Sequence, residues 1–374
     1  MDMTITAKVQ IYPSNEQAEC LLRTMDVYRS ACNFVSGYVF KTHDLSQYSL
    51  NKQLYYQIRD VFGLSSQITQ SVLKTVIAKY KTIRTNQHEW LKPDFKIPQL
   101  DLLWNRDYSL RKDCFSVSSL AGRLKIPYEI KGMEKYFDKS KYSFGTAKLV
   151  YKHKKYFLHI PVSFEVCDSK LEDISNVVGI DRGINFLIAT YDSNGKSDFV
   201  SGRTVKQKRS QYKAVRQQLQ MCKTSSARRR LKAIGSRENR WMNDVNHCVS
   251  KALVNKYDSH TLFVLEDLSG VRHATERVRK KDRYVSVSWS YYDLEQKIKY
   301  KAMKHGCSVI TVNPAYTSQT CPKCGHTERN NRNKKIHLFT CKNCGYKSND
   351  DRIGAMNLYR KGIDYLVPDT VQSE

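Results

Sequence analysis

Acidic residues are scarce in this sequence relative to basic ones. The chain of 374 residues has 36 Asp and Glu against 63 Lys and Arg, a formal net charge of +27. A compact protein with this surplus repels itself unless a polyanion neutralises it, so nucleic acid is the predicted partner. The basic residues are spread along the whole chain and not gathered on one amphipathic helix, which argues against a membrane surface. A basic protein of the ribosomal type is the alternative that charge alone leaves open.

Long apolar segments are also missing. No run is long enough to span a bilayer, and the amino-terminal segment MDMTITAKVQIYP lacks the apolar core of a secretory signal. Paired cysteines are few, because seven of the eleven are single and the other four form two C-x-x-C pairs. This usage indicates reduced thiols with one metal site, and it argues against a disulfide framework. We therefore expect a cytosolic chain.

The amino-terminal half combines strand-like and helical patterns. In TITAKVQIY every second residue is apolar, which predicts a half-buried strand. Ser14 and Gln17 form a capping-box pattern at the start of a long helical stripe. Short strand-like runs return after a second helical stripe and two prolines. We therefore predict a small β-domain made of residues 1–13 and 95–175, with a helical insertion over residues 14–94.

Tyrosine and phenylalanine alternate with lysine in this β-region, as in KYFDKSKYSF and YKHKKYF. Aromatic faces can stack on bases or riboses while lysines meet phosphates. Ordinary strand composition with a solvated basic face explains the same pattern, and both interpretations remain open at this point.

From residue 176 onward, the order of patterns is that of the RNase H fold. Three strand patterns form a meander, and two basic helices follow between Val205 and Asn255. A fourth strand (TLFVLED), a helix from Asp293 to His305, a fifth strand (CSVITV) and a terminal helix complete the series. In this arrangement the first and fourth strands are neighbours. The predicted fold class is therefore α+β and multidomain.

Three acidic residues occupy the ends of these predicted elements. Asp181 ends the first strand in VVGIDRG, Glu266 ends the fourth in FVLEDLSG, and Asp351 opens the final helix in NDDRIGAMNL. Three carboxylates at one point cannot all stay ionised without compensation, and Mg²⁺ prefers such hard oxygen ligands. We predict that these three residues bind two Mg²⁺ ions about 4 Å apart and catalyse phosphodiester hydrolysis. The adjacent Asp350 and Asp267 are interpreted as bystanders, and a scaffold that has lost cleavage is the alternative.

Four cysteines predict a zinc site. CPKC and CKNC lie within the spacing range of four-thiolate zinc ribbons, and each pair is followed by a glycine that suits a tight knuckle. Four protein thiolates leave no position for water, so a structural role is expected for one Zn²⁺. His326 and His337 are interpreted as surface or supporting residues, and Arg329 and Arg332 as phosphate contacts or solvated side chains. The predicted zinc ligands are Cys321, Cys324, Cys341 and Cys344.

These motifs, in this order, resemble those of the TnpB family of transposon-encoded RNA-guided DNA nucleases, relatives of the compact type V CRISPR effectors. The resemblance covers essentially the whole chain and is strongest from Asn176 to Lys361. The closing motif of the family is usually D-x-N-A-A, whereas this chain has Asp351 followed by Arg, Ile, Gly and Ala. The acidic residue of the motif is retained.

The resemblance implies an architecture and partners. It implies a wedge β-barrel (1–13 and 95–175), a helical recognition lobe (14–94) and a RuvC nuclease domain (176–374) that contains a zinc ribbon (316–350). It also implies a metal-dependent DNA endonuclease guided by an RNA from the transposon end. Such an enzyme would act on double-stranded target DNA beside a short motif. A monomer in the bacterial or archaeal cytosol is expected.

Two other classes of function remain open. One is a nuclease-inactive RNA-guided DNA-binding repressor, which the loss of a triad acid would indicate, and none is lost here. The other is an unguided RuvC-type nuclease or a transposase accessory. The RNA that co-purifies with the protein would distinguish guided from unguided activity.

Overall fold

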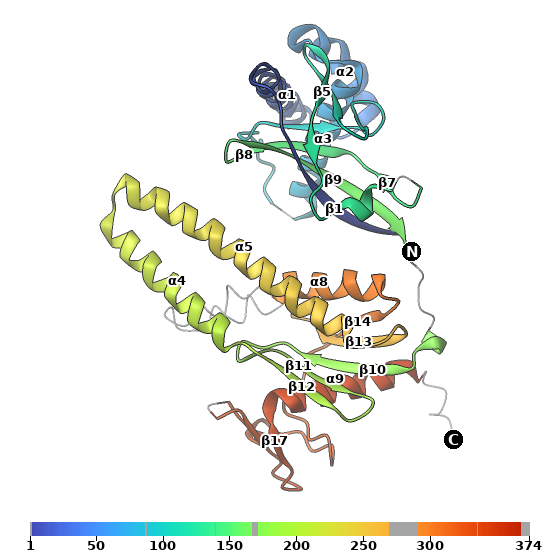
Figure 1. Ribbon diagram of the computed structural model, residues 1–374, viewed down its shortest axis with the longest axis vertical. Helices are drawn as coiled ribbons and strands as arrows, with labels where there is room; N and C mark the ends of the chain where they lie inside the picture. Colours follow the sequence, from blue (N-terminus) through green and yellow to red (C-terminus); the bar gives the residue numbers. More distant parts are fainter. Residues whose placement is uncertain are drawn as a thin grey trace. The chain divides into compact units, whose positions relative to one another are not determined.

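The computed structural model describes residues 2–86, 88–138, 140–166, 171–268, 291–334 and 336–367. The chain divides into two compact units, Asp2–Glu165 and Val166–Glu374. One continuous hydrophobic core fills the first unit, and three smaller clusters stabilise the second. Figure 1 shows the first unit in blue to green and the second in green to red. Within the described ranges, no helix is long and apolar enough to cross a membrane.

Two antiparallel sheets form the framework of the first unit. The larger has the strand order β2-β8-β9-β1-β6, with β7 paired to β9, and the smaller has the order β3-β4-β5. Among the strands that the structure describes, these pairings leave both sheets open, so the barrel remains a prediction. The strands are β1 (Asp2–Ile11), β2 (Gln99–Leu102), β3 (Tyr108–Leu110), β4 (Phe115–Ser119), β5 (Gly122–Ile126), β6 (Tyr128–Glu129), β7 (Ser143–Phe144), β8 (Ala147–Lys152) and β9 (Lys155–Glu165).

The predicted first strand is confirmed as β1. Ala7, Val9 and Ile11 are buried while Lys8 is exposed, as the alternation requires. The strand pairs with β9 along its whole length, from Asp2–Glu165 to Ile11–Tyr156. The first strand in the sequence thus lies inside a sheet whose other strands come from residues 99–165.

Three helices follow β1: α1 (Asn15–Thr42), α2 (Gln47–Phe62) and α3 (Ser66–Thr85). The capping box is confirmed, because the Ser14 side chain accepts from the Gln17 N–H and the Gln17 side chain accepts from the Ser14 N–H. Sequence analysis did not identify α2, although its buried residues Leu50, Leu54 and Ile58 have helical spacing. The three helices share one hydrophobic core with the strands.

The aromatic residues among the lysines serve mainly in packing. Tyr136, Phe144 and Tyr156 are buried in the core of the first unit. Tyr151 is exposed and lies against Tyr156. Most of the aromatic residues that alternate with lysine therefore pack in or against the core, as in an ordinary strand, which favours this interpretation over base stacking.

A five-stranded sheet with the order β12-β11-β10-β13-β14 forms the framework of the second unit. The first three strands are antiparallel, whereas β10 pairs with β13 and β13 with β14 in parallel. The prediction that the first and fourth strands of this unit are neighbours is confirmed. The strands are β10 (Asn176–Asp181), β11 (Phe186–Asp192), β12 (Ser197–Ser201), β13 (Thr261–Glu266) and β14 (Ser308–Val312).

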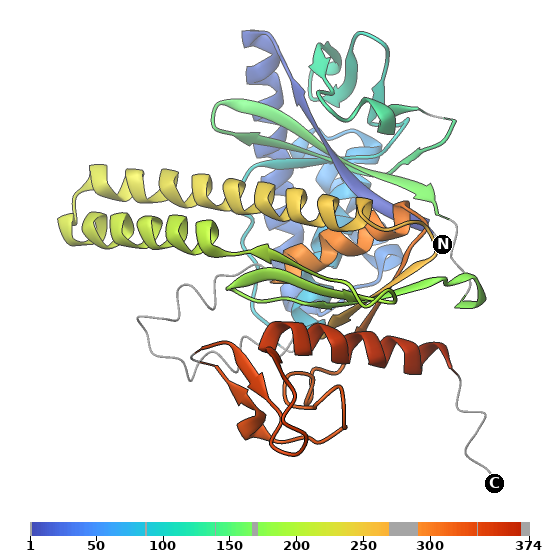
Figure 2. The same ribbon diagram turned by 60° about the horizontal axis from the view of Figure 1, so that its bottom comes forward.

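Helices cover both faces of this sheet, as Figures 1 and 2 show. On one face α5 (Ser225–Asn255) and α8 (Tyr291–Lys304) enclose a core with Val178, Ile180 and Phe263. The two predicted basic helices are confirmed as α4 (Arg203–Cys222) and α5, which form a hairpin that extends beyond the sheet. On the other face, α9 (Asp350–Leu366) packs on β10 and β13.

The packing of α9 on β10 depends on Gly179. A Cβ at this position would lie 2.0 Å from the Ala355 carbonyl oxygen and 2.4 Å from the Tyr359 nitrogen. The helix backbone therefore lies directly on the strand with no side chain between them. This contact brings the start of α9 to the end of β10.

A small sheet of order β15-β16-β17 lies in sequence between β14 and α9. Its strands are β15 (Arg332–Asn333), β16 (Leu338–Thr340) and β17 (Lys347–Asn349). Phe339 and two of the cysteines form a cluster with Ile353 of α9. The sheet thus packs directly on the helix that carries Asp351.

Candidate functional site

The structure brings the three predicted acids together. Asp181 ends β10 and Glu266 ends β13, at the same edge of the parallel pair. Asp351 lies in the first turn of α9. Burial raises the pKa of Asp181 well above its usual range, and the charges of Glu266 and Asp351 raise it further. Asp181 is therefore close enough to the other two carboxylates for their charges to oppose its ionisation. Their catalytic role remains a prediction.

The start of α9 lies against Asp181. A Cβ at Gly354 would meet the Asp181 Oδ2 atom at 2.9 Å. The Asn349 side chain caps the helix by accepting hydrogen bonds from the N–H groups of Asp351 at 3.0 Å and Arg352 at 3.2 Å. These contacts fix the first turn, and with it the backbone of Asp351.

Glu266 is held by neighbouring polar groups. The Thr317 hydroxyl donates to Glu266 Oε1, and the guanidinium of Arg182 donates to the Glu266 backbone carbonyl. The Arg182 side chain is fully buried and also donates to the Glu295 carboxylate at 2.9 Å. This ion pair links the residue after β10 to α8. Sequence analysis identified neither Thr317 nor Arg182 as part of the site.

Asp350, interpreted from the sequence as a bystander beside Asp351, is not a solvated side chain, and whether it takes part in the site stays untested. Its side chain is fully buried, and Arg332 Nε donates to its Oδ2 atom at 2.7 Å. The same guanidinium donates to Ser318 Oγ at 3.0 Å and lies 3.8 Å from Asp351 Oδ1. Arg332 therefore contacts carboxylates, where sequence analysis expected a phosphate contact or a solvated side chain. Burial raises the pKa of Asp351, and the neighbouring charge of Asp350 raises it further, while Arg332 opposes the rise.

His337 also faces Asp350, with Nδ1 at 3.4 Å from Asp350 Oδ1. The other ring nitrogen lies 2.6 Å from the Asn185 side-chain nitrogen, and Lys206 donates to Asn185 Oδ1 at 2.6 Å. Because Lys206 requires the oxygen, the amide nitrogen of Asn185 donates to His337 Nε2. A neutral His337 then carries its proton on Nδ1, on the side of Asp350 but without a hydrogen bond to it. The expectation of a supporting role for His337 agrees with this geometry.

The chemistry of the donors suits a hard divalent cation. Asp181, Glu266 and Asp351 offer only carboxylate oxygens, and the raised pKa values of Asp181 and Asp351 show the energetic cost of burying a charge here beside other carboxylates. A bound cation would remove that cost. His337, Asp350 and Asp351 also have potential ligand atoms within 4.8 Å of one another. The hydrogen-bonded ion pair of Arg332 with Asp350 favours a supporting role for Asp350 over the binding of a further ion there.

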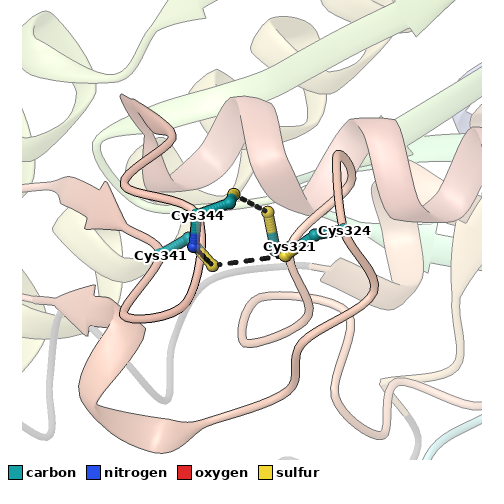
Figure 3. A group of neighbouring side chains, drawn as sticks. All are labelled: Cys321, Cys324, Cys341 and Cys344. Atoms are coloured by element: carbon teal, nitrogen blue, oxygen red, sulfur yellow. Dashed lines mark hydrogen bonds between the residues drawn. The ribbon is translucent and has the colours of Figure 1, made fainter.

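The four predicted zinc ligands converge at one point (Figure 3). The sulfur atoms of Cys321 and Cys344 are 3.6 Å apart, and those of Cys324 and Cys341 are 3.5 Å apart. Four thiolates at the usual zinc–sulfur distance are about 3.8 Å apart in a tetrahedron. This group can hold a zinc ion, as predicted.

Both cysteine pairs are closed by knuckle glycines. Gly325 and Gly345 have φ values of +76° and +68°, and their N–H groups donate to the carbonyls of Cys321 and Cys341. The predicted need for glycine after each pair is confirmed. A hydrogen bond from the backbone of His326 lowers the pKa of the Cys324 thiol to about 6, which favours the thiolate that zinc requires.

Part of the predicted site lies outside the described residues. Ser269 and Gly270, which complete the LEDLSG motif, belong to this part, and so does the basic segment RHATERVRKKDRY at 272–284. Arg329, the other predicted phosphate contact, lies in a short 3₁₀ turn of the ribbon.

Comparisons with known proteins identify two family models. Residues 159–272 match the family described as "Probable transposase" (OrfB_IS605), and residues 291–358 match the "Cas12f1-like, TNB domain". The first match covers four of the five strands of the sheet and two of the acids, and the second covers β14, the ribbon and Asp351.

Individual relatives agree with these models. A CRISPR-associated endodeoxyribonuclease Cas12f1 of Sulfoacidibacillus thermotolerans is 28% identical over 232 residues, 58% of this chain and 53% of the relative. A TnpB-like protein of Methanocaldococcus jannaschii is 29% identical over 217 residues, 56% of this chain and 77% of the relative. The chain spans about half the length of the Cas12f1 relatives it matches.

A solved structure, that of the mini-RNA-guided endonuclease CRISPR-Cas phi3, is similar in fold. The TM-score is 0.60 at 11% identity, over 100% of this chain and 94% of that one. At this identity the likeness concerns the fold alone.

Proposed function

Since this chain is a relative of the TnpB-like proteins and of Cas12f1, as its motifs predicted, we propose that it is an RNA-guided DNA endonuclease. The observation that carries the proposal is the convergence of Asp181, Glu266 and Asp351 from two parallel strands and one helix. The relatives are named endodeoxyribonuclease and TnpB-like protein, and the proposal extends those names to this chain.

The acids would hold two Mg²⁺ ions. Asp181, whose ionisation both Glu266 and Asp351 affect, would be a ligand together with these two residues. When bound, the ions supply an activated water and stabilise the leaving 3′ oxygen, which gives phosphodiester hydrolysis with a 5′ phosphate.

The surrounding residues would keep the ligands in place. Thr317 orients the Glu266 carboxylate, and the buried guanidinium of Arg182 holds the backbone of Glu266 at the end of β13. Asn349 holds the first turn of α9 with Asp351. Because the ligands and the cations act as a unit, loss of any one acid would remove most of the activity.

Guide RNA from a transposon end and double-stranded target DNA are the proposed partners. The charge of +27 suits a protein that holds two nucleic acids at once. Part of this charge lies on the exposed faces of the α4–α5 hairpin, where the basic residues are Arg203, Lys206, Lys208, Arg228, Arg229, Arg230, Lys232, Arg237, Arg240 and Lys251. Base pairing with the guide would choose the target, and the protein would read backbone shape and a short adjacent motif.

The domain assignments remain part of this proposal. Residues 1–13 and 95–175 would be the wedge, 14–94 the recognition lobe, and 176–374 the RuvC domain with its ribbon at 316–350. The protein would act as a monomer in the bacterial or archaeal cytosol.

Reprogramming the guide tests the proposal. The protein is purified from cells that express its transposon end, its RNA is sequenced, and the guide segment alone is changed. Plasmids that match the new guide should be cut in Mg²⁺, and mismatched plasmids should remain intact. Binding without cutting would identify a guided repressor. Cutting that ignores the guide, or that survives removal of the RNA, would leave an unguided nuclease.

A further inference from the structure

Asp350 is the most deeply buried acid at the start of α9. Its exposed fraction is 0%, against 8% for its neighbour Asp351. A buried carboxylate needs partners of opposite charge or hydrogen-bond donors. Arg332 of the ribbon supplies both at Asp350 Oδ2, whereas Oδ1, 3.4 Å from His337 Nδ1, has no hydrogen-bond partner among the described residues.

Arg332 lies between two carboxylates but contacts them unequally. Its Nε atom is 2.7 Å from Asp350 Oδ2, and its nearest nitrogen is 3.8 Å from Asp351 Oδ1. The hydrogen bond to Ser318 holds a third nitrogen. The guanidinium is thus hydrogen-bonded to Asp350, and it stops about 1 Å short of a charge-assisted bond to Asp351.

We infer that Asp350 is a positioning residue that retains Arg332 and thereby leaves Asp351 available to a divalent cation. If Asp350 carried no charge, the nearest carboxylate for Arg332 would be Asp351. A shift of about 1 Å would give an arginine–carboxylate pair at the usual 2.7–2.9 Å. The guanidinium would then compete with the cation for the same oxygen atoms.

His337 and Asn185 contribute to the same support. Lys206 fixes the amide of Asn185, Asn185 fixes the tautomer of His337, and the protonated Nδ1 faces Asp350 Oδ1. One Asp350 oxygen faces His337 without a hydrogen bond to it, and the other accepts from Arg332. The bond at Oδ2, together with the bond from Arg332 to Ser318, gives the guanidinium a defined position.

The inference rests on the proposed function, because it assumes that the triad binds cations. Its test therefore measures binding and not cleavage. Mn²⁺ is titrated into the RNA-loaded protein and followed by electron paramagnetic resonance. Loss of the signal of bound Mn²⁺ in Asp181→Ala assigns that ion to the site formed by Asp181, Glu266 and Asp351.

Asp350→Asn preserves the size of the side chain and removes its charge. We expect its Mn²⁺ dissociation constant to rise roughly 10-fold or more, the usual range for residues that support a metal ligand. The double variant Asp350→Asn with Arg332→Gln should bind Mn²⁺ nearly as tightly as the wild type, because the guanidinium that competes with Mn²⁺ for Asp351 is absent. Arg332→Gln alone should not weaken binding. Asp364→Asn, the same change on an exposed part of α9, is the matched control.

The outcomes separate the possibilities. Wild-type affinity in Asp350→Asn would overturn the inference and leave the proposed function intact. Weak binding that persists in the double variant would also overturn it, since Asp350 would then act on the metal directly or through the fold. Thermal melting and zinc content identify a folding defect. A wild-type protein without triad-bound Mn²⁺ would refute the proposed function and the inference together.

Discussion

A methyl group at Gly179 should separate the two elements that form the acidic site. In Gly179→Ala the new Cβ would lie 2.0 Å from the Ala355 carbonyl and 2.4 Å from the Tyr359 nitrogen. Both are backbone atoms of α9, so no side chain can rotate to make room. The helix itself must move away from β10.

The size of this movement follows from the distances. Carbon–oxygen contacts between packed elements are about 3.3–3.6 Å, so α9 must retreat by roughly 1.3–1.6 Å from the 2.0 Å contact. Overpacking of this kind costs about 1–3 kcal/mol, which lowers Tm by roughly 2–12 °C in a unit of this size. Because Asp351 moves with the helix, a misplacement of more than about 1 Å should also reduce the proposed cleavage rate by roughly 100-fold or more.

Melting and plasmid cleavage are measured on the RNA-loaded protein. Gly235→Ala in α5 is the control, because its Cβ would have the Arg216 side chain at 3.5 Å, an ordinary contact. It should change stability by no more than about 1 kcal/mol, in the favourable direction. Wild-type Tm and cleavage in Gly179→Ala would refute the argument that backbone contact positions Asp351.

Three further predictions concern the acids and the ribbon. Ala in place of Asp181, Glu266 or Asp351 should abolish plasmid cleavage without changing RNA content, and a single variant that cuts at the wild-type rate would remove that residue from the site. Cys341→Ser should lower both the zinc content, measured by elemental analysis, and Tm, since zinc binding contributes folding free energy; Cys222→Ser, at an exposed single cysteine, should change neither. In Mg²⁺-free buffer Asp181→Asn should raise Tm at neutral pH, because a pKa raised in the folded state means that stability is lost as pH rises through it. The gain should shrink as pH falls toward the ordinary Asp pKa of about 3.9, and a constant gain across pH would contradict the electrostatic explanation.

The sequence predicted the elements whose signals are local. The alternation in β1, the capping box of α1 and the acid at the end of a buried strand can each be recognised within a few residues. The strand order could be inferred from the series of elements, and it placed Asp181 beside Glu266. The helix α2 was missed although Leu50, Leu54 and Ile58 carry its spacing, because polar and aromatic residues surround them.

The role of Asp350 could not be read from its neighbours in the chain. An aspartate next to a candidate ligand is usually solvated, and nothing in the segment NDDRIG distinguishes Asp350 from Asp351 in this respect. Its burial results from Arg332 and His337, which the ribbon brings to the start of α9. Contacts between elements decide such a role, and a single sequence taken alone does not record them.

The order of the elements along the chain also has a consequence during synthesis. Asp181 and Glu266 leave the ribosome first, and Asp351 follows only after both cysteine pairs. At about 5–20 residues per second, a growing chain spends several seconds with two of the three acids and no ribbon. The proposed centre is thus incomplete in every nascent chain until Asp351 has been synthesised. A transcript broken before the ribbon would encode a protein that lacks Asp351 and could not cut the DNA that encodes it.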